Sequence, residues 1–330
     1  MSLAIAFLRR WSSNPKYDTL LQKGVTMLRY PAKQPKRDAR PGKMTRRDFV
    51  ALSVTAGVAV TAGCTTEDIP QEIEVVEEDV EITTPDGTAD AAYIHPSTGA
   101  YAGVLIWTDA FGLRPSFRAM ARRLAADGYS VLVPNPFYRV ERAPSFPDAS
   151  VVSFANPEDR ARLGPLMGSI TAPDAAERDA SAYIPFLDAQ PNVDTSKKIG
   201  TQGYCMGGPL IVRTAASQSD RIGAAGSFHG GGLVTTNANS PHLLAPNIQA
   251  SMYFGIAAND DAGQPEAKDV LRETFAGAGV AAEVEVYADS QHGWCVTDMP
   301  AQGDGTPIYN EVDAERAWGK LMELYGAALV

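Results

Sequence analysis

A cysteine set between glycines is the residue best placed for covalent chemistry. Residues 203–208 read Gly-Tyr-Cys-Met-Gly-Gly, after a strand-like segment and before a helix-like one. A strand, a tight turn and a helix form a nucleophile elbow, which would hold Cys205 in a strained conformation at the strand's end. We expect Gly203 and Gly207 there because side chains would collide with neighbouring backbone. The alternative interpretation is a buried cysteine in an ordinary strand–helix turn.

An acid and a base follow later predicted strands. Asp260 comes after the strand at 251–257, and His292 comes after the strand at 282–287. The order nucleophile, acid, base is that of an α/β-hydrolase triad. His292 would accept the thiol proton or stabilise a thiolate, and an ionised Asp260 would fix its tautomer. Cys205 would then attack a carbonyl and form a thioester that water cleaves.

Backbone N–H groups near the thiol would stabilise the oxyanion. We expect one from Met206, at the start of the helix, and one from Ala110, in the loop after an earlier strand. Two neighbours compete for other roles. Asp261 competes with Asp260 as the acid, and His229, at another strand end, is expected to be a wall of the site rather than the base.

Repeated alternation of strands and helices predicts one α/β domain over residues 71–330. We expect a doubly wound, mostly parallel sheet with helices on both faces and the site at the carboxyl ends of the strands. The predicted strands are 71–84, 91–95, 101–107, 129–133, 198–202, 224–228, 251–257 and 282–287, and the predicted helices are 115–127, 174–189, 209–216, 266–278 and 312–329. The first two strands should form an edge hairpin, and 137–172 a loop-like lid or entrance.

Five segments together resemble the dienelactone hydrolase family, whose members are α/β-hydrolases with a Cys-His-Asp triad. The matching segments, in the family's order, are 108–112, 134–139, 203–208, 255–260 and 292–295. The resemblance spans about residues 72 to 328 and implies Cys205 as nucleophile, Asp260 as acid and His292 as base.

The same resemblance implies roles for surrounding residues. Asp109 stands where the family has a thiol-activating Glu, one methylene longer, and Arg139 matches an arginine that binds the lactone carboxylate. Tyr138, Trp294 and His229 are expected to complete the substrate-binding surface. The alternatives are that Asp109 caps its loop and that Arg139 only pairs with a nearby carboxylate.

The resemblance implies a hydrolase that opens a lactone or cleaves a carboxylic ester, with no cofactor and no metal. No Cys/His spacing in the chain is typical of a zinc site. A general carboxylesterase acting on unrelated esters is one alternative. A catalytically inactive α/β-hydrolase fold used as a binding lipoprotein is another, although the complete set of three triad residues argues against it.

The N-terminal region differs in charge from the rest. Residues 1–63 have a net charge of +9 against −10 for the whole chain, which leaves −19 for the body. Such an acidic body argues against binding to nucleic acid or to anionic membranes through its surface. The partner that we expect is a small-molecule ester or lactone.

The basic region itself is typical of an export signal. Arg46 and Arg47 precede an apolar stretch too short to span a bilayer, and small residues then lead to Cys64. This order predicts twin-arginine export over 44–70, to the periplasm or the membrane, with lipid on Cys64. The alternative is an apolar helix beside a chance arginine pair. Residues 1–43 form a basic extension, and Met44 rather than Met1 is the expected start.

Overall fold

The computed structural model describes residues 73–330. The predicted basic extension, the pair Arg46 and Arg47, the Met44 start and the lipidated Cys64 lie outside the described residues. Within 73–330, no helix is both long and apolar enough to cross a membrane.

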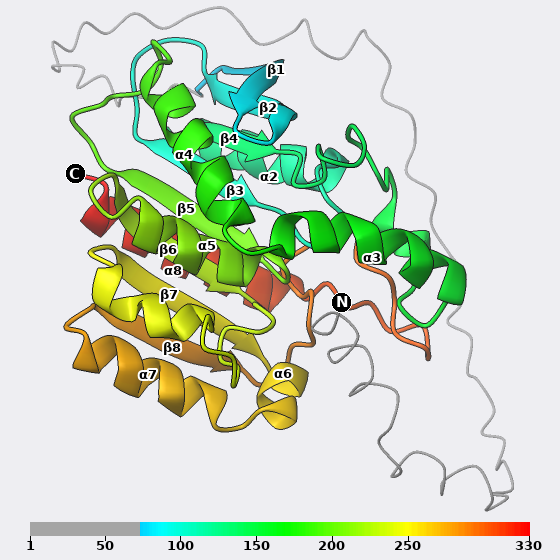
Figure 1. The fold of residues 1–330 in the computed structure, drawn as a ribbon. Helices are drawn as coiled ribbons and strands as arrows, with labels where there is room; N and C mark the ends of the chain where they lie inside the picture. The colour runs from blue at the N-terminus through cyan, green and yellow to red at the C-terminus, as the bar shows by residue number, and fades with distance from the viewer. Residues whose placement is uncertain (1–72) are drawn as a thin grey trace, which may run out of the picture. The chain divides into compact units, whose positions relative to one another are not determined.

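One eight-stranded sheet carries the fold (Figure 1). Its spatial order is β1-β2-β4-β3-β5-β6-β7-β8. The strands are β1 (Val75–Thr84), β2 (Gly87–Pro96), β3 (Gly103–Trp107), β4 (Ser130–Pro134), β5 (Ile199–Tyr204), β6 (Ile222–Phe228), β7 (Ser251–Ala257) and β8 (Ala282–Tyr287). The hairpin β1–β2 is antiparallel, as is β2 with β4, and all the other pairs are parallel. The predicted mostly parallel sheet with an edge hairpin is confirmed.

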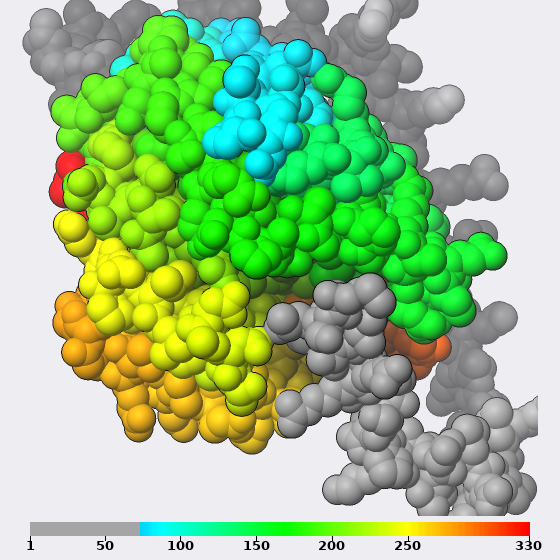
Figure 2. All heavy atoms as spheres, viewed as in Figure 1, coloured from blue at the N-terminus to red at the C-terminus, as the bar shows by residue number. Residues whose placement is uncertain are grey.

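Helices cover both faces of this sheet. They are α2 (Pro115–Ala126), α3 (Pro157–Thr171), α4 (Ala175–Asp188), α5 (Gly207–Ser217), α6 (Ala258–Gly263), α7 (Ala267–Gly277) and α8 (Glu311–Ala328). The buried faces of α3, α4, α5 and α7 share one apolar cluster, and those of α2 and α8 share another. The space-filling view shows the first face, with α3 and α4 in green and α7 in orange (Figure 2).

The sequence of a central strand explains why there are two cores. Successive side chains of a strand point to opposite faces, so Leu105 and Trp107 pack in the first cluster while Val104 and Ile106 pack in the second. A strand buried on both sides must be apolar throughout, and every residue of β3 is buried.

The loop predicted over 137–172 is wrong in its second half, because α3 occupies residues 157–171. Its start carries recognisable signals. The Asn156 side chain accepts a hydrogen bond from the Glu158 N–H, and Pro157 takes the first helical position. A weak apolar periodicity concealed the helix, since Pro165 and two glycines interrupt it. Its buried face consists of Leu163, Leu166 and Ile170.

Candidate active site

Cys205 lies directly after β5 and before α5, with φ at 52°. Such a left-handed conformation is strained for a residue other than glycine. Hydrogen bonds hold it in place. The Cys205 N–H donates to the Phe228 carbonyl at 3.1 Å, and the Cys205 carbonyl accepts from the N–H groups of Gly208 and Gly231, both at 3.1 Å. The elbow predicted from the sequence is therefore present.

The glycines around the thiol are required by close backbone contacts. A Cβ on Gly203 would lie 2.2 Å from the Gly207 carbonyl oxygen, and one on Gly207 would lie 2.4 Å from the Trp107 carbonyl oxygen. Both distances are far below van der Waals contact, so the collisions expected at these two positions are confirmed. The second contact also presses the start of α5 against the end of β3.

The base and its acid meet at the carboxyl ends of β7 and β8. His292 Nδ1 lies 2.8 Å from Asp260 Oδ2, and the His292 N–H donates to Asn259 Oδ1 at 2.8 Å. Asp261 instead pairs with Lys268 Nζ at 2.6 Å. The structure thus brings Asp260, and not Asp261, to His292.

His292 is surrounded by groups that favour its charged form. Burial is the largest single effect and lowers the pKa of His292, but Cys205 and Asp260 together outweigh it through their charges and hydrogen bonds, so that the pKa is raised well above its ordinary value. The imidazole thus has its Nδ1 on the Asp260 carboxylate and lies close enough to the Cys205 thiol for the sulfur to affect its charge. This arrangement can hold a thiolate–imidazolium pair.

The two backbone N–H groups expected to bind the oxyanion have no hydrogen-bond partner among the described residues. Among the described residues, neither the Met206 nor the Ala110 backbone N–H makes a hydrogen bond with the protein. Ala110 lies three residues after Trp107, whose carbonyl touches Gly207, so the two loops are in contact. The geometry is compatible with the donors predicted from the sequence.

Asp109 does not hold the place expected for a thiol activator. Its carboxylate makes two hydrogen bonds with Arg114, at 2.7 and 2.9 Å, and Oδ1 also accepts from the Phe111 N–H at 2.9 Å. Arg114, itself buried, also donates to Asp298 from Nε and Nη2 and to the Gly112 carbonyl from Nη1. Within residues 73–330, Asp109 makes no hydrogen bond to Cys205. We therefore correct the expectation, because Asp109 caps its loop and anchors a buried ion pair.

The polar groups of Arg139 and Tyr138 are bound mainly by carboxylates of the protein itself. Arg139 donates to both Asp179 oxygens, at 2.6 and 3.0 Å, and to Asp86 Oδ2 at 2.7 Å. The Tyr138 hydroxyl donates to Asp179 Oδ1 at 2.7 Å and lies 2.7 Å from Thr84 Oγ1. These bonds join the turn of the edge hairpin to α4. They agree with the alternative that Arg139 pairs with nearby carboxylates, and its binding of a substrate carboxylate stays a prediction.

Two predicted substrate contacts are buried instead. Trp294 has no exposed surface and stacks on Tyr287, with ring centroids 4.7 Å apart. His229 is 1% exposed and lies behind the site, with its ring centroid 4.9 Å from that of His292. Neither side chain presents a surface to a substrate. Both instead pack against other rings, Trp294 on Tyr287 and His229 on His292.

Two further observations concern the cysteines and the groups that could bind a metal. Cys205 and Cys295 are free thiols, and burial, with Asp313 nearby, raises the pKa of Cys295 well above its ordinary value. In the described part of the chain, no cluster of three His, Cys, Asp or Glu side chains could hold a metal ion.

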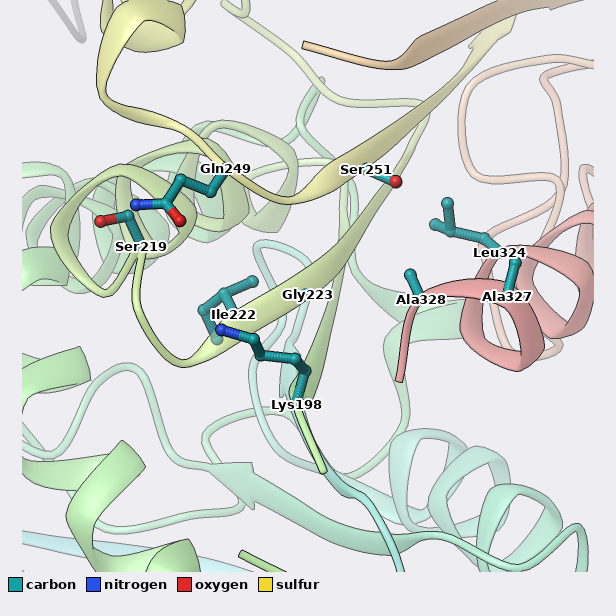
Figure 3. A pocket seen from close by; sticks show the side chains of 9 residues that line it. All are labelled: Lys198, Ser219, Ile222, Gly223, Gln249, Ser251, Leu324, Ala327 and Ala328. Atoms are coloured by element: carbon teal, nitrogen blue, oxygen red, sulfur yellow. The ribbon is translucent and has the colours of Figure 1, made fainter. Parts of the chain in front are cut away.

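A cavity of about 330 Å³ lies at the opposite end of the strands (Figure 3). Lys198, Ile222 and Ser251 line it, and they lie at or just before the starts of β5, β6 and β7. The length of β5, about 20 Å, separates it from Cys205. This cavity is therefore not part of the site around the thiol.

The strand order, the elbow after β5 and the His292–Asp260 pair define an α/β-hydrolase. The chain belongs to the dienelactone hydrolase family, whose family model matches residues 90–329. A carboxymethylenebutenolidase from Rhodococcus opacus is 25% identical over 210 residues, which cover 62% of this chain and 76% of the relative. The chain is a carboxylic ester hydrolase of this family.

Solved structures share the fold. One named m3DLH superposes with a TM-score of 0.63 at 23% identity, covering 78% of this chain and 99% of that one. A dienelactone hydrolase-like promiscuous phosphotriesterase from metagenomic libraries has a TM-score of 0.62 at 23% identity, with the same coverage.

Proposed function

We propose that the protein hydrolyses a small ester or lactone through a thioester on Cys205, with His292 as base and Asp260 as its orienting acid. The observation that carries this proposal is the strained thiol at the end of β5 facing a histidine whose other nitrogen lies 2.8 Å from Asp260. Nucleophile, base and orienting group in contact are the signature of covalent acyl transfer.

The reaction proceeds in two halves. The Cys205 thiolate attacks the carbonyl carbon, and the oxyanion accepts hydrogen bonds from the N–H groups of Met206 and Ala110. The C–O bond then breaks, and His292 gives its proton to the leaving oxygen. In a lactone that oxygen remains attached to the acyl group, so the ring opens. Water, deprotonated by His292, next attacks the thioester, releasing the carboxylic acid and restoring the thiol–histidine pair.

Asp260 holds His292 in the tautomer that both halves require. Asp260→Asn is expected to lower kcat by roughly 10² to 10⁴-fold, because an amide can present its N–H to Nδ1 and favour the wrong tautomer. The matched control Asp261→Asn should stay within about threefold of wild type, since it touches Lys268 and not His292. Steady-state rates for an aryl acetate measure both. A reversed pattern would make Asp261 the acid.

The contacts of Arg139 favour a neutral substrate over a carboxylate-bearing lactone. A guanidinium that already donates four hydrogen bonds to Asp86 and the buried Asp179 has its charge neutralised and only one of its five N–H groups left for a substrate anion. Arg114, the buried guanidinium in the loop after β3, is likewise held between two carboxylates. The second candidate function, a general carboxylesterase acting on neutral esters, rests on these pairings.

Arg139→Ala is expected to act on stability rather than on substrate choice. Asp179 would lose its cation in a buried setting, which should cost about 3 kcal/mol in the free energy of unfolding. The control Arg142→Ala removes an exposed pair with Glu81 and should cost less than about 1 kcal/mol. Urea denaturation measures both. A rise in KM for anionic esters but not for neutral esters would instead show that Arg139 binds the substrate.

The test of the proposed function compares two substrates. A dienelactone and a neutral aryl acetate are offered to the protein, with Cys205→Ala as the control. We expect turnover of the neutral ester, lost in the variant. Turnover of the lactone alone would show that an anion-binding group operates despite the paired arginines. No cleavage of either by a folded protein would contradict the proposed substrate class.

A further inference from the structure

One buried side chain touches both the proposed nucleophile and the proposed base. His229 Nδ1 accepts a hydrogen bond from the Cys205 N–H at 3.1 Å, in addition to the bond that this N–H makes to Phe228. Its ring meets the His292 ring edge-on, with centroids 4.9 Å apart, and meets Trp294 in the same manner at 5.2 Å.

The backbone holds this ring rigidly in place. His229 has φ at 42°, a second left-handed residue beside that of Cys205, and its N–H donates to the Gly255 carbonyl at 2.8 Å. A Cβ on Gly208 would lie 2.4 Å from Gly230 Cα, so the segment after β6 presses directly on the start of α5. A strained conformation held by its surroundings is typical of functional positions.

The hydrogen bond also fixes the protonation of His229. A nitrogen that accepts cannot carry a proton, so the neutral ring has its proton on Nε2. That atom is buried and has no hydrogen-bond partner among residues 73–330. Burial, and then His292 nearby, lower the pKa of His229 well below its ordinary value. The ring therefore keeps its acceptor and leaves the positive charge to His292.

We propose that His229 is a positioning residue, which holds the Cys205 thiol and the His292 imidazole in the correct position relative to each other. The inference rests on the proposed covalent function. Through Nδ1 His229 fixes the backbone of the nucleophile, and through its ring edge it supports the base. A phenylalanine of similar size would fill the same space but could not accept the Cys205 N–H.

Two variants separate the acceptor from the bulk. His229→Phe keeps a ring against His292 and Trp294 but removes the acceptor. His229→Asn places Oδ1 near the position of Nδ1, and Asn tolerates left-handed φ values. His229→Gln places its amide further out, and serves in place of the Phe variant if that variant does not fold.

The first readout is alkylation of Cys205 by iodoacetamide near neutral pH, followed by peptide mass spectrometry. The second is kcat and KM for an aryl acetate. We expect His229→Phe to lower the alkylation rate and kcat roughly tenfold or more, with KM within about threefold, because a lost hydrogen bond misplaces the thiol. We expect the alkylation rate and kcat of His229→Asn to be at least about threefold higher than those of His229→Phe.

Two results would overturn the proposal. Wild-type rates in the Phe or Gln variant would show that the acceptor is unnecessary. Equal losses in the Asn and Phe variants would reduce His229 to a packed core residue. Alkylation does not require hydrolysis, so it tests this inference separately. If Cys205→Ala retained turnover, the proposed function would fail while the alkylation rates still reported on His229.

Discussion

Cys205→Ala is expected to lower kcat for ester hydrolysis by roughly 10³-fold or more, because the proposed acyl-enzyme forms on the Cys205 sulfur. The residual rate would come from the oxyanion donors and from substrate binding alone. Initial rates with a neutral aryl acetate, at saturating substrate, measure the loss.

The fold should survive this substitution. Alanine and cysteine both carry a Cβ, so the strain at φ 52° is unchanged, and the elbow's hydrogen bonds are all made by backbone atoms of Cys205. We expect the thermal midpoint to shift by no more than a few degrees. A variant that unfolds would leave the loss uninterpreted, so circular dichroism accompanies the assay. A folded variant with near-wild-type turnover would remove Cys205 from the mechanism.

His292→Ala is expected to reduce kcat to a similar degree. The thiol loses its proton acceptor and its imidazolium partner, and the leaving oxygen loses its proton donor. The Asp260 carboxylate is then left facing a cavity in place of the ring. Rates across the neutral and alkaline range, where a free thiol ionises by itself near pH 8.5, will show activity rising with pH in the variant.

The double variant Cys205→Ala/His292→Ala tests whether the two residues act as a unit. Groups that share one step are strongly non-additive, so the double variant should be about as slow as the worse single variant. A product of the two single losses would mean that the residues contribute to separate steps. The mechanism proposed above would then need another base.

The chemistry of the site was easier to predict than its supporting contacts. The elbow is a local motif, since its glycines and its thiol lie within six residues. The choice of Asp260 over Asp261 came from the alignment of a short segment with the family, and the 2.8 Å contact with His292 agrees with it.

The ion pairs that the sequence did not reveal have a common physical cause. Arg139 meets Asp86 and Asp179, which lie 53 and 40 residues away in the sequence, and no periodicity in the chain reports such a pairing. Asp109 meets Arg114 five residues on, but Arg114 also binds Asp298, which lies 184 residues away in the sequence. A charged side chain can be assigned to substrate binding only when it is known whether charged residues of the protein already pair with it.

Trp294 and α3 show two other limits. An aromatic residue beside the base suggested a substrate contact, yet its stacking on Tyr287 buries it completely. The helix α3 has the start signals of Asn156 and Pro157, but its interior glycines and Pro165 hide the apolar face. The signal at the helix start was thus more informative than the periodicity of the helix that follows.

Direct detection of the acyl-enzyme is the sharpest test of the central claim. The protein is mixed with a neutral aryl acetate, quenched in acid during turnover, digested and mapped by mass spectrometry. We expect an acetyl group on the peptide that contains Cys205, removed by hydroxylamine as a thioester is, and absent from Cys205→Ala. An acetyl group on another residue that turns over at the catalytic rate, or unchanged hydrolysis by Cys205→Ala, would contradict the account.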